Sequence, residues 1–477
     1  MMERGRLGRS CRIEHLYFGV FHNCEKPFGW IAITLFLLAM TACQPAASDP
    51  KPSKSRSAGS ESSSRASRPQ SPPLAHWPLF RGNAQATGVA SSDLPEDLEL
   101  LWTFSSEEGG FEATAAIVDG VVYVGCTDGK LYAINLATGK KRWAYGTTLG
   151  FSTSAAVRDG LVYLGDTDGR FHCVNAATGK SKWRFDAEAE INSSANFHGC
   201  HVLFGSQDTR LYCLDAASGE LAWTYESPDQ IRCFPTVFGS TVLVAGCDGH
   251  LHIIDLRRGV ELGQVAIHSP TGSSPAILDA MAFVGTEGGQ FFAIDLRLAL
   301  EAAAKKQAAS GGLSQVSSDK NGTVPSPTAD ASGSETKDSV GPGNAILWQF
   351  RNPEHGASFR SSAAVTPQAV IIGSRDKQLR AFDPKTGNPL WSFLAKGRID
   401  SSPVVVGQRV FVGSADGRVH AIDVNTGKAV WQFEAGGAVV ASPAVAEGCL
   451  VIGNDSGTLY CFGAKSDRER GASERSR

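Results

Sequence analysis

The sequence has few long hydrophobic runs and no excess of basic charge. The chain has 477 residues, and after residue 40 it contains no apolar run long enough to cross a bilayer. This argues against a multi-span membrane protein. The 45 Lys and Arg residues face 48 Asp and Glu residues, giving a net charge of −3. A dedicated nucleic-acid binder would show a basic bias, so we expect no nucleic-acid partner.

Motifs for catalysis and metal binding are also missing. The sequence contains no GxGxxG loop, no P-loop and no Ser-His-Asp arrangement that can be argued, and its 11 cysteines show no CxxC spacing. His250 and His252 form an HxH pair on one face of an expected strand, which leaves a two-histidine surface metal site as a weak alternative. We therefore predict no catalytic residues and no metal site.

The N-terminus has the pattern of an export signal, expected to occupy residues 1–42. The apolar run from Trp30 to Met40 is too short to span a bilayer and has the length of a signal-peptide core. The residues before Cys43 resemble a bacterial lipobox, which implies that Cys43 is lipidated; a plain signal peptide is the alternative. Residues 43–76 form a Ser- and Pro-rich stretch that cannot bury enough apolar surface to fold, so we expect a disordered linker.

The rest of the chain repeats with a period of about 40 residues, typical of a repeat fold. Strand-like phrases such as Val122-Tyr123-Val124-Gly125 recur eight times, ending at 450–453. Tryptophan marks seven of the repeats, at Trp102, Trp143, Trp183, Trp223, Trp348, Trp391 and Trp431. Gly263 stands where the remaining repeat would have its tryptophan.

One repeat contains four short strands, A to D, at 401–406, 410–413, 419–423 and 429–433. Asp-Gly and Thr-Gly pairs between the strands supply the positive φ angles that tight hairpin turns require. With 52 glycines and 22 prolines, the composition fits many short strands joined by turns. The pattern predicts an all-β, eight-bladed β-propeller of four-stranded antiparallel blades over residues 77–463.

The two ends of the repeat array complement each other. The last repeat stops after its strand C at 459–462, and the strand 100–104 has no A, B or C strand before it. We expect the N-terminal strand to complete the eighth blade and close the ring. An insertion at about 298–344, helical at its start and then rich in Ser and Gly, is expected to be a disordered loop of blade five. The charged residues 464–477 are expected to form a disordered tail.

The phrase Ala-Ile-Asp-x-x-Thr-Gly-Lys-x-x-Trp at 421–431 resembles the PQQ-like propeller repeat, as do the segment 382–387 and the opening Trp77-Pro-Leu-Phe-Arg-Gly-Asn83. The resemblance implies that the tryptophans pack between blades as structural docking residues. Within this superfamily, the chain looks like the BamB outer-membrane assembly lipoproteins in plan, which implies a BamA-like barrel-assembly partner. Quinoprotein alcohol dehydrogenases are similar in their repeats, but their adjacent Cys-Cys pair is missing here and no calcium cluster can be assembled.

A ring of positions just before strand A is expected to face the central funnel. The equivalent residues recur every 40 positions, apart from the insertion, and four of them are charged. They are Glu112, Ser152, Asn192, Arg232, Gly272, Arg360, Asp400 and Val440. A solvated channel wall with balanced charges is one interpretation, and a polar pocket for a small ligand or a peptide end is the other.

The sequence thus favours a non-catalytic envelope lipoprotein, monomeric and facing the periplasm from the outer membrane, that binds other proteins without a cofactor. Its rim and strand edges would hold peptide segments by β-augmentation. Two alternatives stay open: a PQQ-dependent quinoprotein oxidoreductase, and an envelope sensor or polysaccharide-binding propeller.

Overall fold

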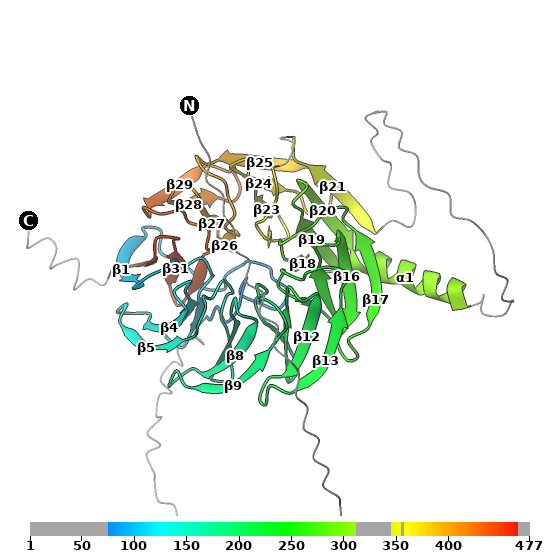
Figure 1. Ribbon diagram of the computed structural model, residues 1–477. Coiled ribbons are helices and arrows are strands. Elements are labelled where there is room, and N and C mark those ends of the chain that lie inside the picture. Colours follow the sequence, from blue (N-terminus) through cyan, green and yellow to red (C-terminus); the bar gives the residue numbers. More distant parts are fainter. Residues whose placement is uncertain (1–74, 312–344, 354–356, 466–477) are drawn as a thin grey trace, which may run out of the picture. The chain divides into compact units, whose positions relative to one another are not determined.

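The computed structural model describes residues 75–311, 345–353 and 357–465. The predicted signal peptide, Cys43 and most of the predicted linker and tail lie outside these ranges. Within them, 32 strands form eight four-stranded antiparallel sheets arranged as the blades of a ring (Figure 1). The predicted eight-bladed propeller is therefore confirmed. No helix in the described ranges is long and apolar enough to pass through a membrane.

Each blade runs from its inner strand A to its outer strand D in chain order. Blades 1 to 4 consist of β2 (Ala116–Val118), β3 (Val121–Gly125), β4 (Lys130–Asn135) and β5 (Lys141–Gly146); β6 (Ala156–Arg158), β7 (Leu161–Gly165), β8 (Arg170–Asn175) and β9 (Ser181–Asp186); β10 (Asn196–His198), β11 (His201–Gly205), β12 (Arg210–Asp215) and β13 (Leu221–Glu226); and β14 (Thr236–Phe238), β15 (Thr241–Ala245), β16 (His250–Asp255) and β17 (Glu261–Ala266).

Blades 5 to 7 follow the same order. They consist of β18 (Ala276–Leu278), β19 (Met281–Gly285), β20 (Gln290–Asp295) and β21 (Ile346–Arg351); β22 (Ala364–Val365), β23 (Val370–Gly373), β24 (Gln378–Phe382) and β25 (Pro389–Leu394); and β26 (Val404–Val406), β27 (Arg409–Ser414), β28 (Arg418–Asp423) and β29 (Ala429–Glu434). Strand A is shorter than the predicted 401–406, because Ser402 donates its backbone N–H across to Ser442 Oγ of the next blade (2.9 Å).

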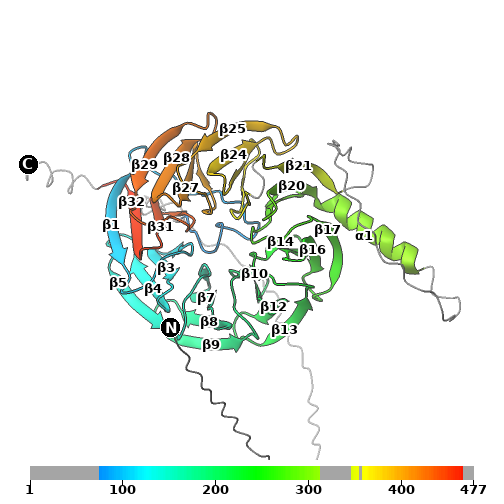
Figure 2. The same ribbon diagram turned by 45° about the horizontal axis from the view of Figure 1, so that its top comes forward.

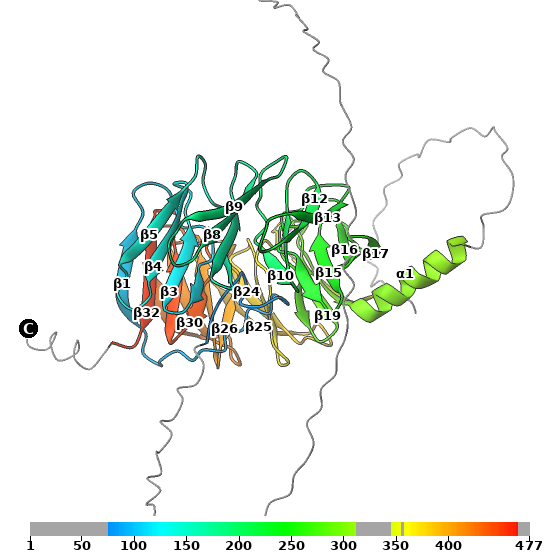
Figure 3. The same ribbon diagram turned by 90° about the horizontal axis from the view of Figure 1, so that it is seen from below.

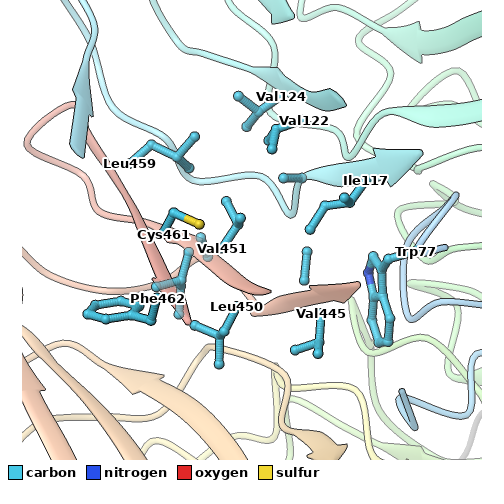
Figure 4. Packing of buried hydrophobic residues seen from close by; sticks show 14 of the residues in the cluster. Trp77, Ile117, Val122, Val124, Val445, Leu450, Val451, Leu459, Cys461 and Phe462 are labelled. Carbon is cyan, nitrogen blue, oxygen red and sulfur yellow. The ribbon is translucent and has the colours of Figure 1, made fainter. Parts of the chain in front are cut away.

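Blade 8 is built from both ends of the chain, as expected. β30 (Ala444–Ala446), β31 (Cys449–Gly453) and β32 (Thr458–Gly463) are completed by β1 (Glu99–Ser105), which pairs antiparallel with β32. The apolar core at this closure joins side chains of blades 7, 8 and 1. Figure 4 shows part of this core, with Trp77 lying beside Ile117 and Val445. Ring closure therefore buries residues from opposite ends of the sequence in one cluster.

The insertion in blade 5 begins with α1 (Leu296–Gly311), which packs against β17 (Figure 2). The helix expected at the start of the insertion is therefore confirmed, and it extends slightly beyond the predicted helical run at both ends. Ala303 of α1 lies against Gly263, where a Cβ atom would come within 2.6 Å of the Ala303 Cβ. Blade 4 has Gly263 where the other blades have a tryptophan, and α1 fills the space that the indole would occupy. Residues 312–344 lie outside the described ranges.

The segment from Trp77 to Ser92 crosses the ring near its axis (blue in Figures 1 and 3). It makes hydrogen bonds with all eight blades. In most of them a carbonyl oxygen of the segment accepts from a backbone N–H of an A strand. The bonds are Trp77 N to Ile117 O, Val157 N to Pro78 O, Asn196 Nδ2 to Ala84 O, Val237 N to Ala84 O, Ile277 N to Gln85 O, Val365 N to Thr87 O, Val405 N to Gly88 O and Gly448 N to Ser92 Oγ, at 2.7 to 3.0 Å. The sequence predicted its presence but not this tie across the ring.

Candidate binding site on the propeller axis

The eight funnel positions predicted from the repeat line one cavity of about 190 Å³ on the axis. Each stands two residues before a second inward-facing position, because side chains of an extended chain alternate between two faces. The second layer consists of Thr114, Ser154, Ser194, Phe234, Ser274, Ser362, Ser402 and Ser442. The repeat therefore builds a two-layered wall in which a small polar residue forms nearly all of the deeper layer.

Backbone N–H groups of the deeper layer donate to the hydroxyl of the next blade. Six such bonds, of 2.9 to 3.1 Å, join Thr114 to Ser154, Ser154 to Ser194, Phe234 to Ser274, Ser274 to Ser362, Ser362 to Ser402 and Ser402 to Ser442. Phe234 has no hydroxyl and interrupts the series after Ser194. Because these groups are buried, each lost acceptor would leave a costly unpaired N–H. These hydrogen bonds link successive blades around the cavity.

The N-terminal segment contributes an aromatic side chain to the cavity wall. Phe80 lines the cavity together with Phe234, and their ring centroids lie 5.7 Å apart. The neighbouring Arg81 is buried and donates from Nη2 to the carbonyl oxygen of Ala363 at 2.9 Å. Burial lowers the pKa of Arg81 to about 9, because desolvation disfavours the charged guanidinium. The cavity therefore combines a polar wall with an aromatic contribution from a segment that the repeat does not predict.

Asp400 is the most strongly held acidic group of the ring. Arg375 donates to both of its carboxylate oxygens at 2.8 and 2.9 Å, and Arg398 donates from Nε at 3.0 Å. The hydrogen bond to Asp400 is the largest cause that raises the pKa of Arg375. Sequence analysis missed both arginines: Arg398 lies two residues from Asp400 and could have been found, whereas Arg375 comes from the turn between β23 and β24.

The other charged positions are less constrained. Arg232 donates to Gln230 Oε1 at 2.6 Å through Nη2, and the Arg360 side chain, 47% exposed, lies 3.5 Å from a carboxylate oxygen of Glu287. They belong to blades 4 and 6, on either side of Gly272 in blade 5, where an added Cβ would meet nothing within 4 Å. Ser152 donates to Asn192 Oδ1 at 2.8 Å in blades 2 and 3. The ring can thus offer cationic groups and open space on one side.

Glu112 occupies the position in blade 1, four blades from Gly272 and therefore across the axis from it. Val440 supplies an apolar position in blade 8. The arrangement can hold a small polar or charged group by hydrogen bonds and charge. It presents no nucleophile with an adjacent base, and we derive no reaction from it.

The predicted docking tryptophans lie between neighbouring blades. In six of them the indole Nε1–H donates to a backbone carbonyl of the following blade at 2.6 to 3.2 Å. The pairs are Trp102 to Leu136, Trp143 to Ala176, Trp183 to Ala216, Trp223 to Leu256, Trp348 to Pro384 and Trp391 to Val424. Trp431 packs against Phe462 of β32, with ring centroids 5.3 Å apart.

The remaining sequence candidates are not brought together as a metal centre. His252 is buried beside Asp248 Oδ2 (3.0 Å) and Tyr225 Oη (3.1 Å). Its imidazole ring is therefore held at the interface between blades 3 and 4. His250 also lies near Asp248. Across the described ranges, no group of three or more His, Cys, Asp or Glu side chains could hold a metal ion. Burial raises the pKa of the Cys173 and Cys213 thiols to about 12, which keeps them protonated.

The chain is similar to known proteins in both sequence and fold. A family model described as outer membrane protein assembly factor BamB matches residues 83–156, 146–315 and 338–471, well over half of the chain. No curated protein matches the chain.

Solved structures share the fold at low sequence identity. BamB from Moraxella catarrhalis is 17% identical, with a TM-score of 0.58, covering 77% of this chain and 100% of that one. Quinohemoprotein alcohol dehydrogenase from Comamonas testosteroni is 17% identical, with a TM-score of 0.61, covering 82% and 81%. A europium-containing methanol dehydrogenase is 12% identical, with a TM-score of 0.63, covering 82% and 98%. At these identities the likeness shows the propeller fold alone.

Proposed function

The chain belongs to the family of the outer membrane protein assembly factor BamB, and on this basis we propose that it is a non-catalytic envelope scaffold that binds proteins during outer-membrane protein assembly. The observation that carries the proposal is the extent of the family match, which includes every blade of the ring. The expected partner is a BamA-like barrel-assembly protein.

The outer surface of the ring supports a binding role. The D strands are the outer edges of the blades, and an extended peptide can add to such an edge through backbone hydrogen bonds. Several of these strands also expose large apolar side chains: Leu221 of β13 is 51% exposed, Leu390 of β25 is 50% and Leu394 of β25 is 68%. These residues offer apolar contacts beside free backbone groups.

The fit of a quinone cofactor can be tested on the axial cavity, where the related dehydrogenase fold would hold it. That cofactor is expected to need a metal ion held by acidic side chains, and among the described residues no group of three or more His, Cys, Asp or Glu side chains could hold one. The sequence also lacks adjacent cysteines. On these two observations our proposal includes no cofactor and no oxidoreductase step.

We further propose that Cys43 carries the lipid anchor and that residues 43–76 let the propeller stand off the periplasmic face of the outer membrane. The support is the lipobox-like sequence before Cys43 and the polar composition after it. Replacing Cys43 by serine should release the chain from membranes, as measured by fractionation and by loss of metabolic labelling with a fatty acid. Retention of the label would contradict the assignment.

The function is tested by capture from native membranes after mild crosslinking, using the full chain tagged at its C-terminus and mass spectrometry of the eluate. We expect a BamA-like barrel protein, and the Cys43→Ser chain is the matched control for recruitment by membrane anchoring alone. Recovery of unrelated envelope proteins or glycans instead would refute the assembly role and favour a sensor or polysaccharide-binding propeller. Titration with PQQ and Ca²⁺, followed by absorbance and dye-linked alcohol oxidation, tests the oxidoreductase alternative.

A further inference from the structure

The axial cavity has a mouth and a closed end. Along each A strand the funnel position comes first, and the residue of the deeper layer follows two positions later. In blade 6 these are Arg360 and Ser362, and three positions further on Val365 donates its N–H to Thr87 O of the N-terminal segment at 2.8 Å. Because that segment crosses the ring near its axis (Figure 1), it closes the cavity at the end away from the funnel ring.

The closed end contains a positive charge without a counter-charge. Arg81 of the N-terminal segment is 1% exposed, and its Nη2 donates to the carbonyl oxygen of Ala363, the residue next to Ser362 of the cavity wall. Among the described residues its Nε and Nη1 have no hydrogen-bond partner. Burial lowers its pKa, and no carboxylate of the described chain raises it. A buried charge of this kind is costly, and its field extends into the neighbouring cavity because the protein interior screens it weakly.

Two arginines at the mouth are also weakly compensated. The exposed Arg232 donates to Gln230, a neutral side chain, and Arg360 has the carboxylate of Glu287 at the long distance of 3.5 Å. They belong to blades 4 and 6, and Gly272 of blade 5 leaves open space between them. An anion that enters on this side of the mouth therefore meets two guanidinium groups.

The acidic groups at the cavity do not cancel this positive charge. Asp400 is bound by Arg375 and Arg398 together, so these two arginines exceed it by one charge. Glu112 stands in blade 1, across the axis from Gly272. The charged groups of the wall, of its direct partners and of the closed end are thus five arginines and three carboxylates, namely Arg81, Arg232, Arg360, Arg375, Arg398, Glu112, Glu287 and Asp400.

The size and lining of the cavity indicate which anion fits. Its volume of about 190 Å³ lies below the roughly 300 to 1,000 Å³ of sites that enclose a whole small molecule, so it can hold one end of a larger ligand. Phe80 and Phe234 offer aromatic contact on the wall. An arginine fork donates two parallel hydrogen bonds to a carboxylate. Glu112 and Asp400 would repel a doubly charged phosphate more strongly than a singly charged carboxylate.

We propose that the axial cavity binds the C-terminal carboxylate of a polypeptide chain. Arg232 and Arg360 would hold the carboxylate beside Gly272, and the side chain of the last residue would pack against Phe80 and Phe234. The charge of Arg81 attracts the ligand from the closed end without contacting it. The proposal rests on the proposed scaffold function, because a protein that binds other proteins during their assembly meets their chain ends.

The first test is calorimetric titration of the full chain with N-acetyl-Ala-Ala-Phe, which ends in a free carboxylate, and with the same peptide amidated at its C-terminus. We expect the free acid to bind at least roughly tenfold more tightly, because amidation removes the charge that the arginines pair with. Equal binding of the two peptides, or binding of neither, would overturn the proposal. Acetate binding as tightly as the acid peptide would overturn it as well, since the ligand would then be a small free carboxylate.

The second test assigns the binding to the mouth. Arg232→Ala combined with Arg360→Ala should weaken binding of the acid peptide at least roughly tenfold. The matched control is Arg184→Ala combined with Arg258→Ala, which removes the same charge from exposed side chains of β9 and of the turn after β16. An equal loss of affinity in the control would mean that net charge alone is responsible, and the assignment to the cavity would fail.

The contribution of Arg81 is tested by charge. Arg81→Met should weaken binding of the acid peptide, whereas Arg81→Lys keeps the charge and should retain the affinity. Circular dichroism first establishes that each variant is folded, because Arg81 also donates to Ala363 O. Unchanged affinity in folded Arg81→Met, or an equal loss in folded Arg81→Lys, would contradict the role of its charge.

Capture from membranes separates this proposal from the scaffold function. If the chain captures a barrel protein but does not bind the acid peptide, the cavity proposal fails and the function stands. If the acid peptide binds through Arg232 and Arg360 but no barrel protein is captured, the cavity proposal stands and the assembly role fails.

Discussion

Two glycine substitutions measure how much the close contact between a turn glycine and a docking tryptophan contributes to stability. Gly179 and Gly160 both belong to blade 2 and have nearly the same backbone angle, with φ of 70° and 73°. An added Cβ at Gly179 would lie 2.7 Å from the Trp143 indole, whereas at Gly160 it would meet nothing within 4 Å. Alanine at the two positions therefore incurs the same backbone strain and differs in the collision with Trp143.

The expected magnitudes follow from these two contributions. Alanine held at a left-handed φ costs about 1 kcal/mol, so Gly160→Ala should lower the free energy of unfolding by about that amount. Gly179→Ala adds the cost of overpacking against Trp143, about 1 to 3 kcal/mol, for about 2 to 4 kcal/mol in all. In a Trp143→Ala background the collision is gone, and the effect of Gly179→Ala should fall back to about 1 kcal/mol.

The assay is urea unfolding followed by far-UV circular dichroism, which does not depend on the tryptophan signal. Midpoints are compared between variants whose dependence on urea concentration is unchanged. Equal destabilisation by Gly160→Ala and Gly179→Ala would refute the idea that the turn glycine is required by the indole. An excess that persists without Trp143 would refute it as well.

Three further outcomes are expected. Ser362→Ala should lower the free energy of unfolding by about 1 to 3 kcal/mol in urea titrations, because the buried N–H of Ser274 loses its acceptor. Burial lowers the pKa of His420, so the stability that its neutral form supports is present above pH 6.5 and lost as pH falls toward its folded pKa; His420→Leu should flatten the drop in urea midpoint between pH 7.5 and 5.5. Arg232→Ala combined with Arg360→Ala should change the urea midpoint little, since both side chains are exposed, yet reduce partner capture at least roughly tenfold if the axial ring binds the partner; undiminished capture would leave the ring as a solvated wall.

Most of the axial site could be predicted from the repeat, because equivalent residues of equivalent blades must face the axis. Glu112 and Asp400, selected by spacing alone, both line the cavity. Arg375, which holds Asp400, was not predicted, since its turn approaches the axis only once the blades are assembled. The contribution of Phe80 was missed for the same reason: nothing local to residues 77–83 indicates which blades they touch.

By itself, the sequence determined the number of blades, the order of strands in each and the closure of the ring by β1. Those features depend on local chemistry, namely side-chain alternation, hairpin turns and the 40-residue period. The tertiary structure decided the contacts between blades, such as the hydrogen bonds that residues 77–92 make across the ring and the helix that fills the place of the tryptophan at Gly263. Each joins groups far apart in the chain, and their meeting depends on how the closed ring places one blade against the next.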